Sequence, residues 1–203
     1  AALEADSYLE RNLRAIEASA REAMAAVREN LARLRPIHAG SVTVATCLKA
    51  ALDDLSIPPE VTVDRSGVEG FPPVIASRHS LTFVFKNLIE NALRALACGA
   101  DASAGLIHIG GSVHGSWVEV AVTDDGPGIA PDRQAEIFEF KPSFDVSSDT
   151  PSASELYAPG LGFGLWWVRT LLMRLGGSVS VESGEGYGTT FRIRLPRAEG
   201  AHA

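Results

Sequence analysis

Two asparagines and an arginine stand at helical spacing in the segment FKNLIENALR, where their side chains could serve a cation and an anion together. Asn87, Asn91 and Arg94 follow one another at intervals of four and three residues, which places them along one side of a helix. An amide oxygen can bind a hard metal ion, and a guanidinium can bind phosphate oxygens. The alternative is that both amides only form local hydrogen bonds at the edge of the core.

A second polar motif, TDDGPGI, comes directly after a predicted strand. Asp124 at the strand end could accept a hydrogen bond from an exocyclic amine. Gly126 and Gly128 allow a tight turn and a close approach of the backbone before Ile129. Acidic glycine turns are common, so this motif alone leaves an ordinary turn as an open alternative.

A third motif, GLGFGL, has a glycine at every second position from Gly160 to Leu165 and leads into a predicted helix. Alternating glycines can turn their amides toward a ligand. The helix start adds free N–H groups and the positive end of the dipole, so an anion is favoured here. The pattern matches neither a Walker loop nor the Rossmann fingerprint, and its meaning depends on the order of the motifs around it.

The elements that must position these motifs follow from the hydrophobic pattern. One long helix is predicted from Leu3 to about Arg35, with an apolar stripe typical of a helical bundle or coiled coil. After it, the pattern predicts helices near 44–55, 78–98 and 165–175, and strands near 61–63, 74–75, 107–113, 117–123, 178–182 and 189–195. These elements predict a mixed sheet covered on one side by helices. Residues 140–160 show neither period and predict a long loop, either a functional lid or a disordered segment.

The composition limits the classes of partner and the compartment. A formal charge of −7 argues against nucleic acid or an anionic membrane surface as the main partner. Cys47 and Cys98 have apolar neighbours and are expected to be core residues in a reducing compartment. No apolar run approaches the roughly 18 residues of a membrane span. We therefore expect a cytoplasmic location, with a membrane anchor left open for a longer protein.

The order of the motifs resembles that of the ATP-binding catalytic domain of sensor histidine kinases. This superfamily also includes DNA gyrase, the mismatch-repair ATPases and the heat-shock chaperone ATPases. NLIENAL resembles the N box, DDGPGI the first glycine box, IFEF the F box and GLGFGL the second glycine box. The likeness runs from about residue 42 to 196. It implies an α/β fold: a two-layer sandwich with a mixed, mostly antiparallel sheet of the Bergerat type, here preceded by a long N-terminal helix.

The resemblance also implies a role for each motif residue in binding ATP and Mg²⁺. Asn91 would be the metal ligand, with Asn87 and Arg94 as catalytic residues near the phosphates. Asp124 would receive the adenine amine, with Thr189 supporting it. The remaining nucleotide contacts would come from Gly126, Gly128, Ile129, Lys141, Gly160, Leu161, Gly162, Phe163, Gly164 and Leu165. The segment around Lys141 departs from the common F-box pattern.

One substitution favours phosphoryl transfer over hydrolysis. In the ATPases of the superfamily, a glutamate four residues before the metal-binding asparagine activates water, and here that position is Asn87. Glu90 is one residue from Asn91 and points about 100° away. Transfer to an acceptor leaves the protein mainly positioning and charge neutralisation to do.

The phosphoacceptor is expected outside this chain. None of the five histidines is followed directly by an acidic residue, and His38 is interpreted as a linker residue. We expect residues 1–38 to be the second helix of a truncated phosphoacceptor hairpin that forms a homodimer, with a generic coiled-coil linker as the alternative. Residues 39–197 would be the catalytic domain and 198–203 a tail. The expected partners are the acceptor hairpin and the receiver domain of a response regulator.

Two other functions stay open at this point. One is a serine kinase of the anti-sigma-factor type, which has a similar nucleotide site but no hairpin. The other is a degenerate docking or phosphotransfer module that has kept the fold without binding nucleotide.

Overall fold

A computed structural model of the 203-residue chain describes residues 38–97, 105–139 and 163–198. They belong to one compact unit, Ile37–Phe140 together with Gly162–Ala203. The predicted N-terminal helix and the predicted loop at 140–160 lie outside the described residues, as do Cys98, Lys141, Gly160, Leu161 and Gly162.

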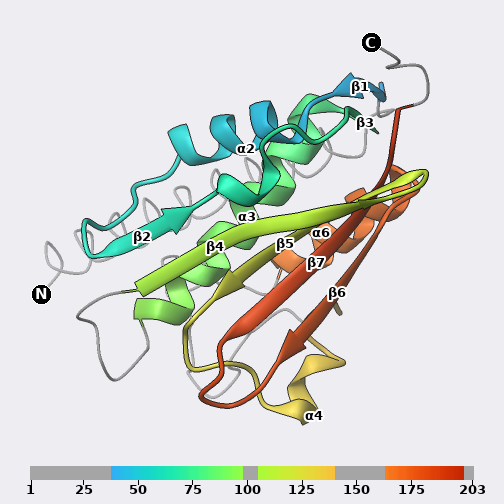
Figure 1. Ribbon diagram of the computed structural model, residues 1–203. Coiled ribbons are helices and arrows are strands. Elements are labelled where there is room, and N and C mark those ends of the chain that lie inside the picture. Colours follow the sequence, from blue (N-terminus) through green and yellow to red (C-terminus); the bar gives the residue numbers. More distant parts are fainter. Residues whose placement is uncertain (1–37, 98–104, 140–162, 199–203) are drawn as a thin grey trace, which may run out of the picture. The chain divides into compact units, whose positions relative to one another are not determined.

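The centre of the described unit is a five-stranded sheet with the strand order β2-β4-β5-β7-β6 (Figure 1). The strands β2 and β4 are parallel, and the other three neighbouring pairs are antiparallel. The bounds are β2 (Val61–Asp64), β4 (Gly105–His114), β5 (Trp117–Asp124), β6 (Ser178–Ser183) and β7 (Thr189–Pro196). The predicted mixed, mostly antiparallel sheet is confirmed.

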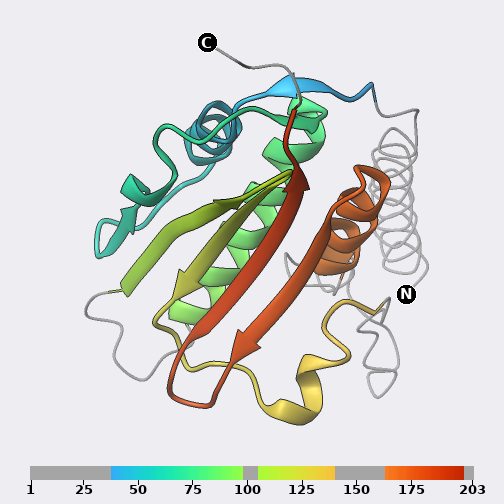
Figure 2. The same ribbon diagram turned by 45° about the vertical axis from the view of Figure 1, so that its right-hand side comes forward.

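Helices cover one face of this sheet (Figure 2). Helices α3 (Arg78–Ala97) and α6 (Phe163–Arg174) pack on the strands, and α2 (Val44–Asp53) packs on α3. The α3 helix begins after Ser77, whose Oγ accepts a hydrogen bond from the N–H of Ser80 at 3.4 Å. The prediction of an α/β sandwich is therefore confirmed for the described residues.

Three short elements were not predicted. One is strand β1 (Gly40–Val42), which pairs with β3 (Val74–Ala76), the strand predicted near 74–75, in a separate two-stranded sheet. The others are α4 (Pro131–Gln134) and the 3₁₀ turn η1 (Ser66–Val68). Elements of three or four residues are too short to show a period. In addition, α6 begins at Phe163, so Gly164 lies in its first turn rather than before the helix.

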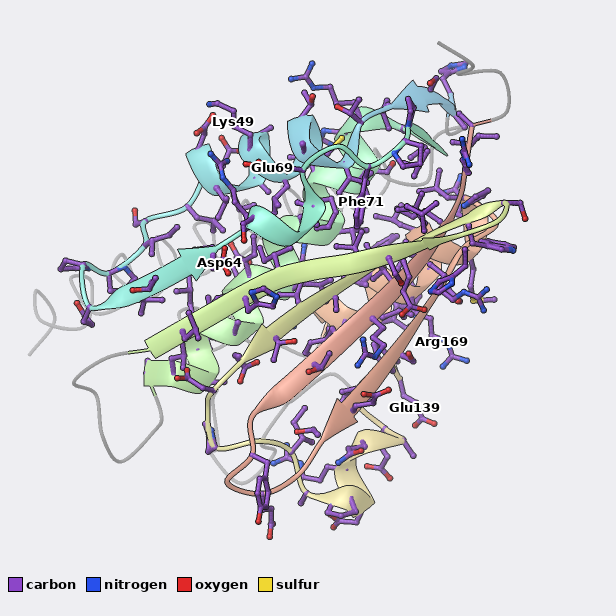
Figure 3. All side chains as sticks on the ribbon, in the orientation of Figure 1. Lys49, Asp64, Glu69, Phe71, Glu139 and Arg169 are labelled. Carbon is purple, nitrogen blue, oxygen red and sulfur yellow. The ribbon has the colours of Figure 1, made fainter. Side chains whose placement is uncertain are left out.

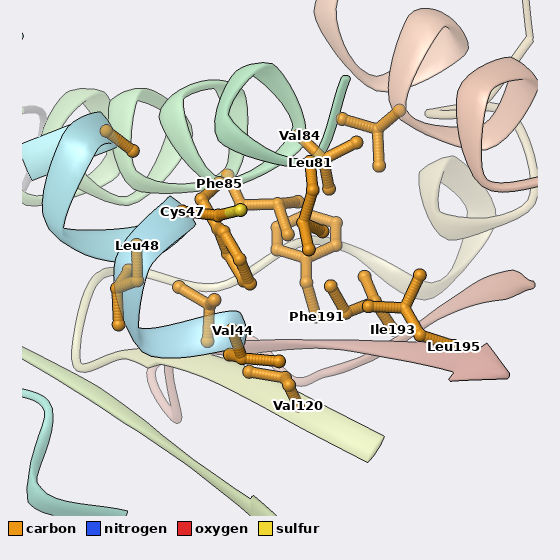
Figure 4. Close-up of a cluster of buried hydrophobic side chains, with 14 of the residues drawn as sticks. Val44, Cys47, Leu48, Leu81, Val84, Phe85, Val120, Phe191, Ile193 and Leu195 are labelled. Carbon is orange, nitrogen blue, oxygen red and sulfur yellow. The ribbon is translucent and has the colours of Figure 1, made fainter. Parts of the chain in front are cut away.

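The core lies between the sheet and the helices (Figure 4). Phe85 of α3 and Ile193 and Leu195 of β7 are fully buried, and Phe191 is 3% exposed. Leu81, Leu88 and Ala92 of α3 are also buried in this core. Cys47 of α2 is fully buried in the same cluster, and burial raises the pKa of its thiol. Cys47 is thus a core residue, as predicted.

The other face of the sheet is polar. Arg192 of β7 forms an ion pair with Glu182 of β6 at 2.9 Å, and its guanidinium lies 4.0 Å from Glu119 of β5. Asp64, labelled at the end of β2 in Figure 3, lies 2.9 Å from Nδ1 of His108. The alternation of apolar and polar residues along the strands explains why only one face carries helices.

Candidate functional site

Three polar side chains form a row across the ends of three neighbouring strands. Asp124 of β5 pairs with Thr189 of β7, and Thr189 pairs in turn with Ser183 of β6. All three occupy inward positions of their strands, and the other inward residues of these strands are apolar. Asp124 and Thr189 are each only 4% exposed. The row therefore places polar groups at the margin of the core, where they need partners.

The carboxyl group of Asp124 is buried and lacks a cationic partner in the interactions recorded for the described residues. Burial raises its pKa to about 6, although the backbone N–H groups of Gly126 and Thr189 oppose the shift. The Gly126 N–H donates to Asp124 Oδ1 at 3.1 Å. At neutral pH this residue is thus a buried anion that accepts hydrogen bonds, and such perturbed groups are typical of functional sites.

Two glycines after Asp124 allow close contacts that a side chain would block. A Cβ on Gly126 would lie 2.8 Å from Asp124 Oδ1 and 3.1 Å from the Cβ of Ala95 on α3. Gly128 has a φ of +79°, and a Cβ there would overlap the carbonyl oxygen of Gly184 in the β6–β7 turn. The Gly128 position therefore requires glycine, and a side chain at Gly126 would crowd the Asp124 carboxylate and α3.

A set of hydrogen bonds fastens this loop to the β6–β7 hairpin. The N–H of Ile129 donates to Ser183 Oγ at 2.8 Å. Gln134 Nε2 donates to the carbonyl oxygens of Ile129 and Ser183 at 2.8 and 2.9 Å. The N–H of Gly186 donates to the carbonyl oxygen of Pro127 at 2.7 Å. The loop following Asp124 is thus held at several points by the neighbouring hairpin.

The Asn87 and Asn91 amides of α3 form hydrogen bonds within their own helix, but one of their nitrogens has no partner among the described residues. Asn87 Nδ2 donates to the carbonyl oxygen of Phe83 at 2.9 Å, and Arg94 Nη2 donates to Asn91 Oδ1. Asn91 Nδ2 is buried and has no hydrogen-bond partner within the described part of the chain. The local hydrogen bonds that the sequence left as an alternative are therefore present, but they do not satisfy the Asn91 amide.

The start of α6 lies beside these amides. A Cβ on Gly164 would come within 2.7 Å of Asn87 Oδ1. Leu165, the next residue, packs against the core. The third glycine of the GLGFGL motif therefore lets the α6 backbone approach α3.

The described site residues thus form two groups joined through α3. One contains Asp124, Gly126, Gly128, Ile129 and Thr189, and the other contains Asn87, Asn91, Arg94, Gly164 and Leu165. Phe163 begins α6. Ser183, Gln134 and Ala95 were missed as site residues. For Ser183 the signal was a hydroxyl at an inward strand position that continues the apolar pair Val179 and Val181.

Comparison with known proteins identifies the family. Residues 76–199 match the family described as histidine kinase-, DNA gyrase B-, and HSP90-like ATPase. The chain belongs to this family, and the resemblance seen in the sequence is confirmed.

Curated relatives of the chain are sensor kinases. It is 34% identical to the sensor protein KdpD of Rathayibacter rathayi over 158 residues, covering 77% of this chain and 17% of that protein. It is 32% identical to the sensor histidine kinase ZraS of Escherichia coli (strain K12) over 137 residues, covering 68% of this chain and 26% of that protein. The chain thus spans only about a quarter or less of the length of these relatives.

Solved structures share the fold. A full-length ShkA in complex with AMPPNP superposes with a TM-score of 0.59 at 24% identity, covering 80% of this chain and 32% of that chain. The mycobacterial sensor histidine kinase MprB superposes with a TM-score of 0.59 at 22% identity, covering 78% of this chain and 98% of that chain. In the part of the chain that the structure describes, no helix has the length and apolar character needed to cross a membrane.

The described residues suit the ATP that this family binds. Asp124 offers a buried acceptor for an amino group. Gly126 lets the loop backbone lie close to Asp124 and α3, and Gly164 lets α6 lie close to Asn87. The Asn91 amide oxygen and the Arg94 guanidinium, which are bonded to each other, are polar groups of the kind that contact a metal ion and phosphates.

Proposed function

We propose that this chain is the ATP-binding catalytic part of a sensor histidine kinase. It would transfer the γ-phosphoryl group of ATP to a histidine on its own phosphoacceptor hairpin, for relay to the receiver domain of a response regulator. The observation that carries the proposal is the buried Asp124 carboxylate, fixed beside the helix that bears Asn91 and Arg94. The family match and the sensor-kinase relatives support it.

The base would be held on the Asp124 side of the site. An ionised carboxylate accepts hydrogen bonds only, which suits the exocyclic amine of adenine. Thr189, the cross-strand neighbour of Asp124, would add a second polar contact. Gly126 would keep the loop backbone close to the Asp124 carboxylate and to α3.

The phosphates and Mg²⁺ would be held on the α3 side. Asn91 Oδ1 would bind the ion once Arg94 turns from that oxygen toward the phosphates. Lys141 and the glycines from Gly160 to Gly164 are proposed to contribute further contacts. ATP supplies the phosphoryl group, and the protein supplies position and neutralising charge.

Transfer is proposed over hydrolysis because no base stands where the related ATPases have one. Asn87 occupies that position, and its amide donates to the Phe83 carbonyl oxygen. An amide cannot remove a proton from water at neutral pH. The acceptor histidine would therefore supply the nucleophile.

Calorimetric titration with a non-hydrolysable ATP analogue, with and without Mg²⁺, tests the nucleotide site. We expect magnesium-dependent binding to the parent chain and none to Asp124→Ala. Asp125→Asn is the control. The Asp125 carboxylate follows Asp124 directly in the chain but is exposed, and it accepts a hydrogen bond from the Leu106 N–H. A folded parent chain without binding would move the function to the docking-module alternative.

Labelled ATP tests the proposed reaction. A longer piece of the protein that contains the acceptor hairpin should gain phosphate that is labile in acid and stable in alkali. The present chain alone should gain none. Such phosphate on the chain alone would contradict the expectation that the acceptor lies elsewhere.

A further inference from the structure

Ser183 is the last residue of β6, and its hydroxyl group, on the inward face of the sheet, makes three contacts. It donates to the carbonyl oxygen of Gly188 at 2.8 Å. It accepts from the N–H of Ile129 at 2.8 Å. It also lies 3.0 Å from the hydroxyl oxygen of Thr189. This one side chain therefore connects the loop after Asp124, the β6–β7 turn and the polar row.

These contacts determine which way the Ser183–Thr189 hydrogen bond runs. A hydroxyl has one hydrogen and two acceptor lone pairs. A carbonyl oxygen can only accept, so the hydrogen of Ser183 goes to Gly188. The hydrogen between the two hydroxyls must then come from Thr189. As a result, Thr189 Oγ1 presents only lone pairs to any other group that approaches it.

Thr189 and Asp124 then act together as acceptors. They are cross-strand partners, both inward and both almost fully buried. The ionised carboxylate has no hydrogen to give. We propose that Ser183, through the proton order it imposes on Thr189, makes this site selective for purine nucleotides with an exocyclic amino group over those with a carbonyl oxygen there. The inference rests on the proposed nucleotide-binding function.

The chemical reason is the match of donors and acceptors. An amino group can donate its two hydrogens to the two acceptors, the Asp124 carboxylate and Thr189 Oγ1. A carbonyl oxygen brings another acceptor and leaves buried groups unpaired, which opposes binding strongly. Ser183 is thus a positioning residue, which acts on the base through Thr189.

The surrounding contacts hold Ser183 in this arrangement. Its carbonyl oxygen accepts from Gln134 Nε2 at 2.9 Å. Gly188, which receives the hydrogen, is confined because a Cβ there would overlap the carbonyl oxygen of Asp124. Without the Ser183 hydroxyl, Thr189 could rotate its hydrogen toward the ligand instead.

The test compares the imido analogues of ATP and inosine triphosphate by calorimetry. The inosine compound has a carbonyl oxygen in place of the amino group and a hydrogen on the adjacent ring nitrogen. At about pH 8 the Asp124 carboxyl, with its pKa of about 6, is ionised. We expect the parent chain to prefer the ATP analogue, and Ser183→Ala to lower the ratio of the two dissociation constants about tenfold. Ser183→Thr keeps the hydroxyl and should keep the ratio.

A matched control lies on the other face of the sheet. The hydroxyl oxygens of Thr123 and Thr190 are 3.0 Å apart there. Thr190→Val removes a hydroxyl from a comparable cross-strand pair and should leave the ratio unchanged.

The other possible results of this comparison either support or overturn the role proposed for Ser183. If Ser183→Ala weakens both nucleotides equally, Ser183 is merely structural and the inference is overturned. If Ser183→Ala does not fold, Thr189→Val replaces it: loss of discrimination supports the inference, and a parental ratio overturns it. A folded parent chain that binds neither nucleotide overturns the proposed function and this inference together. Binding of the ATP analogue with an unchanged ratio in the variants overturns this inference alone.

Discussion

The two groups of the candidate site differ in how their hydrogen bonds are arranged. Around Asp124 the recorded bonds cross between elements, joining the loop, the β6–β7 hairpin and α4. On α3, Asn87 and Arg94 bond within their own helix, and Asn91 Nδ2 is left without a partner in the described residues. The first group is therefore held by hydrogen bonds between elements, whereas the hydrogen bonds of the second group lie within one helix.

This difference indicates that the two ends of a bound nucleotide would meet different kinds of surface. The base end would meet groups that are already fixed, because moving Asp124 would require the strands and their glycine contacts to move. On α3, the described amides need only turn their side chains, since they give up local bonds rather than strand pairing. Substitutions in the first group should therefore change stability most, and those in the second should change mainly ligand binding.

The largest expected effect is on the β6–β7 turn. Gly188→Ala should lower the free energy of unfolding by about 3–4 kcal/mol, because the φ of +78° strains an alanine and its Cβ would overlap the Asp124 carbonyl oxygen. Gly186→Ala is the matched control: its φ is +77°, but its Cβ would meet nothing within 4 Å. That variant should lose only about 1 kcal/mol. If urea unfolding gives both variants the same loss in free energy of unfolding, the close contact between Gly188 and the Asp124 carbonyl oxygen does not stabilise the Asp124 group.

The next effect concerns the buried charge of Asp124. Asp124→Asn should raise the free energy of unfolding by about 2–3 kcal/mol above pH 7, because it removes a charge that burial disfavours. The same variant should bind the ATP analogue about 10–100-fold more weakly, because a charged acceptor is lost. Stability and binding should therefore move in opposite directions.

The pH dependence follows from the same pKa. Burial raises the pKa of Asp124 to about 6 in the folded chain, from an ordinary value of 3.8. The folded state then takes up the proton first, so the penalty is complete above about pH 6 and is relieved as the pH falls toward 4. The stability gain of Asp124→Asn should shrink over that interval in thermal unfolding. A gain that stays constant down to pH 4 would contradict the assignment.

The same contrast explains how much the sequence could predict. The sheet and the three helices could be predicted from the hydrophobic period because that signal is local, and the motif TDDGPGI correctly placed Asp124 at the end of a strand. The role of Ser183 could not be predicted, because it depends on the register of β6 against β7 and on a loop more than 50 residues away. The Asn91–Arg94 bond is local in sequence, but its presence depends on side-chain rotation that spacing does not reveal.

A smaller effect on stability is expected on α3. Asn91→Leu should raise the free energy of unfolding by about 1 kcal/mol, since it removes a buried amide nitrogen that lacks a partner. Magnesium should no longer strengthen binding of the ATP analogue. Asn87→Leu is the comparison, because its amide is satisfied by the Phe83 carbonyl oxygen and its loss should not stabilise the chain. A destabilised Asn91→Leu chain would mean that this amide is satisfied in solution.

The smallest change in stability is expected at the start of α6. In Gly164→Ala the new Cβ would approach Asn87 Oδ1 to 2.7 Å, but that oxygen is the end of a side chain that can turn away. Alanine also favours the helix over glycine by about 1 kcal/mol, so the net change should stay within about 0.5 kcal/mol. Binding of the ATP analogue should nevertheless weaken several-fold, because Asn87 is displaced from the phosphate side. Unfolding and calorimetry on the same sample separate the two effects. If Gly164→Ala loses stability but keeps its affinity for the ATP analogue, the contrast between the two groups is contradicted. The α3 group, and not only the Asp124 group, would then be fixed by the fold.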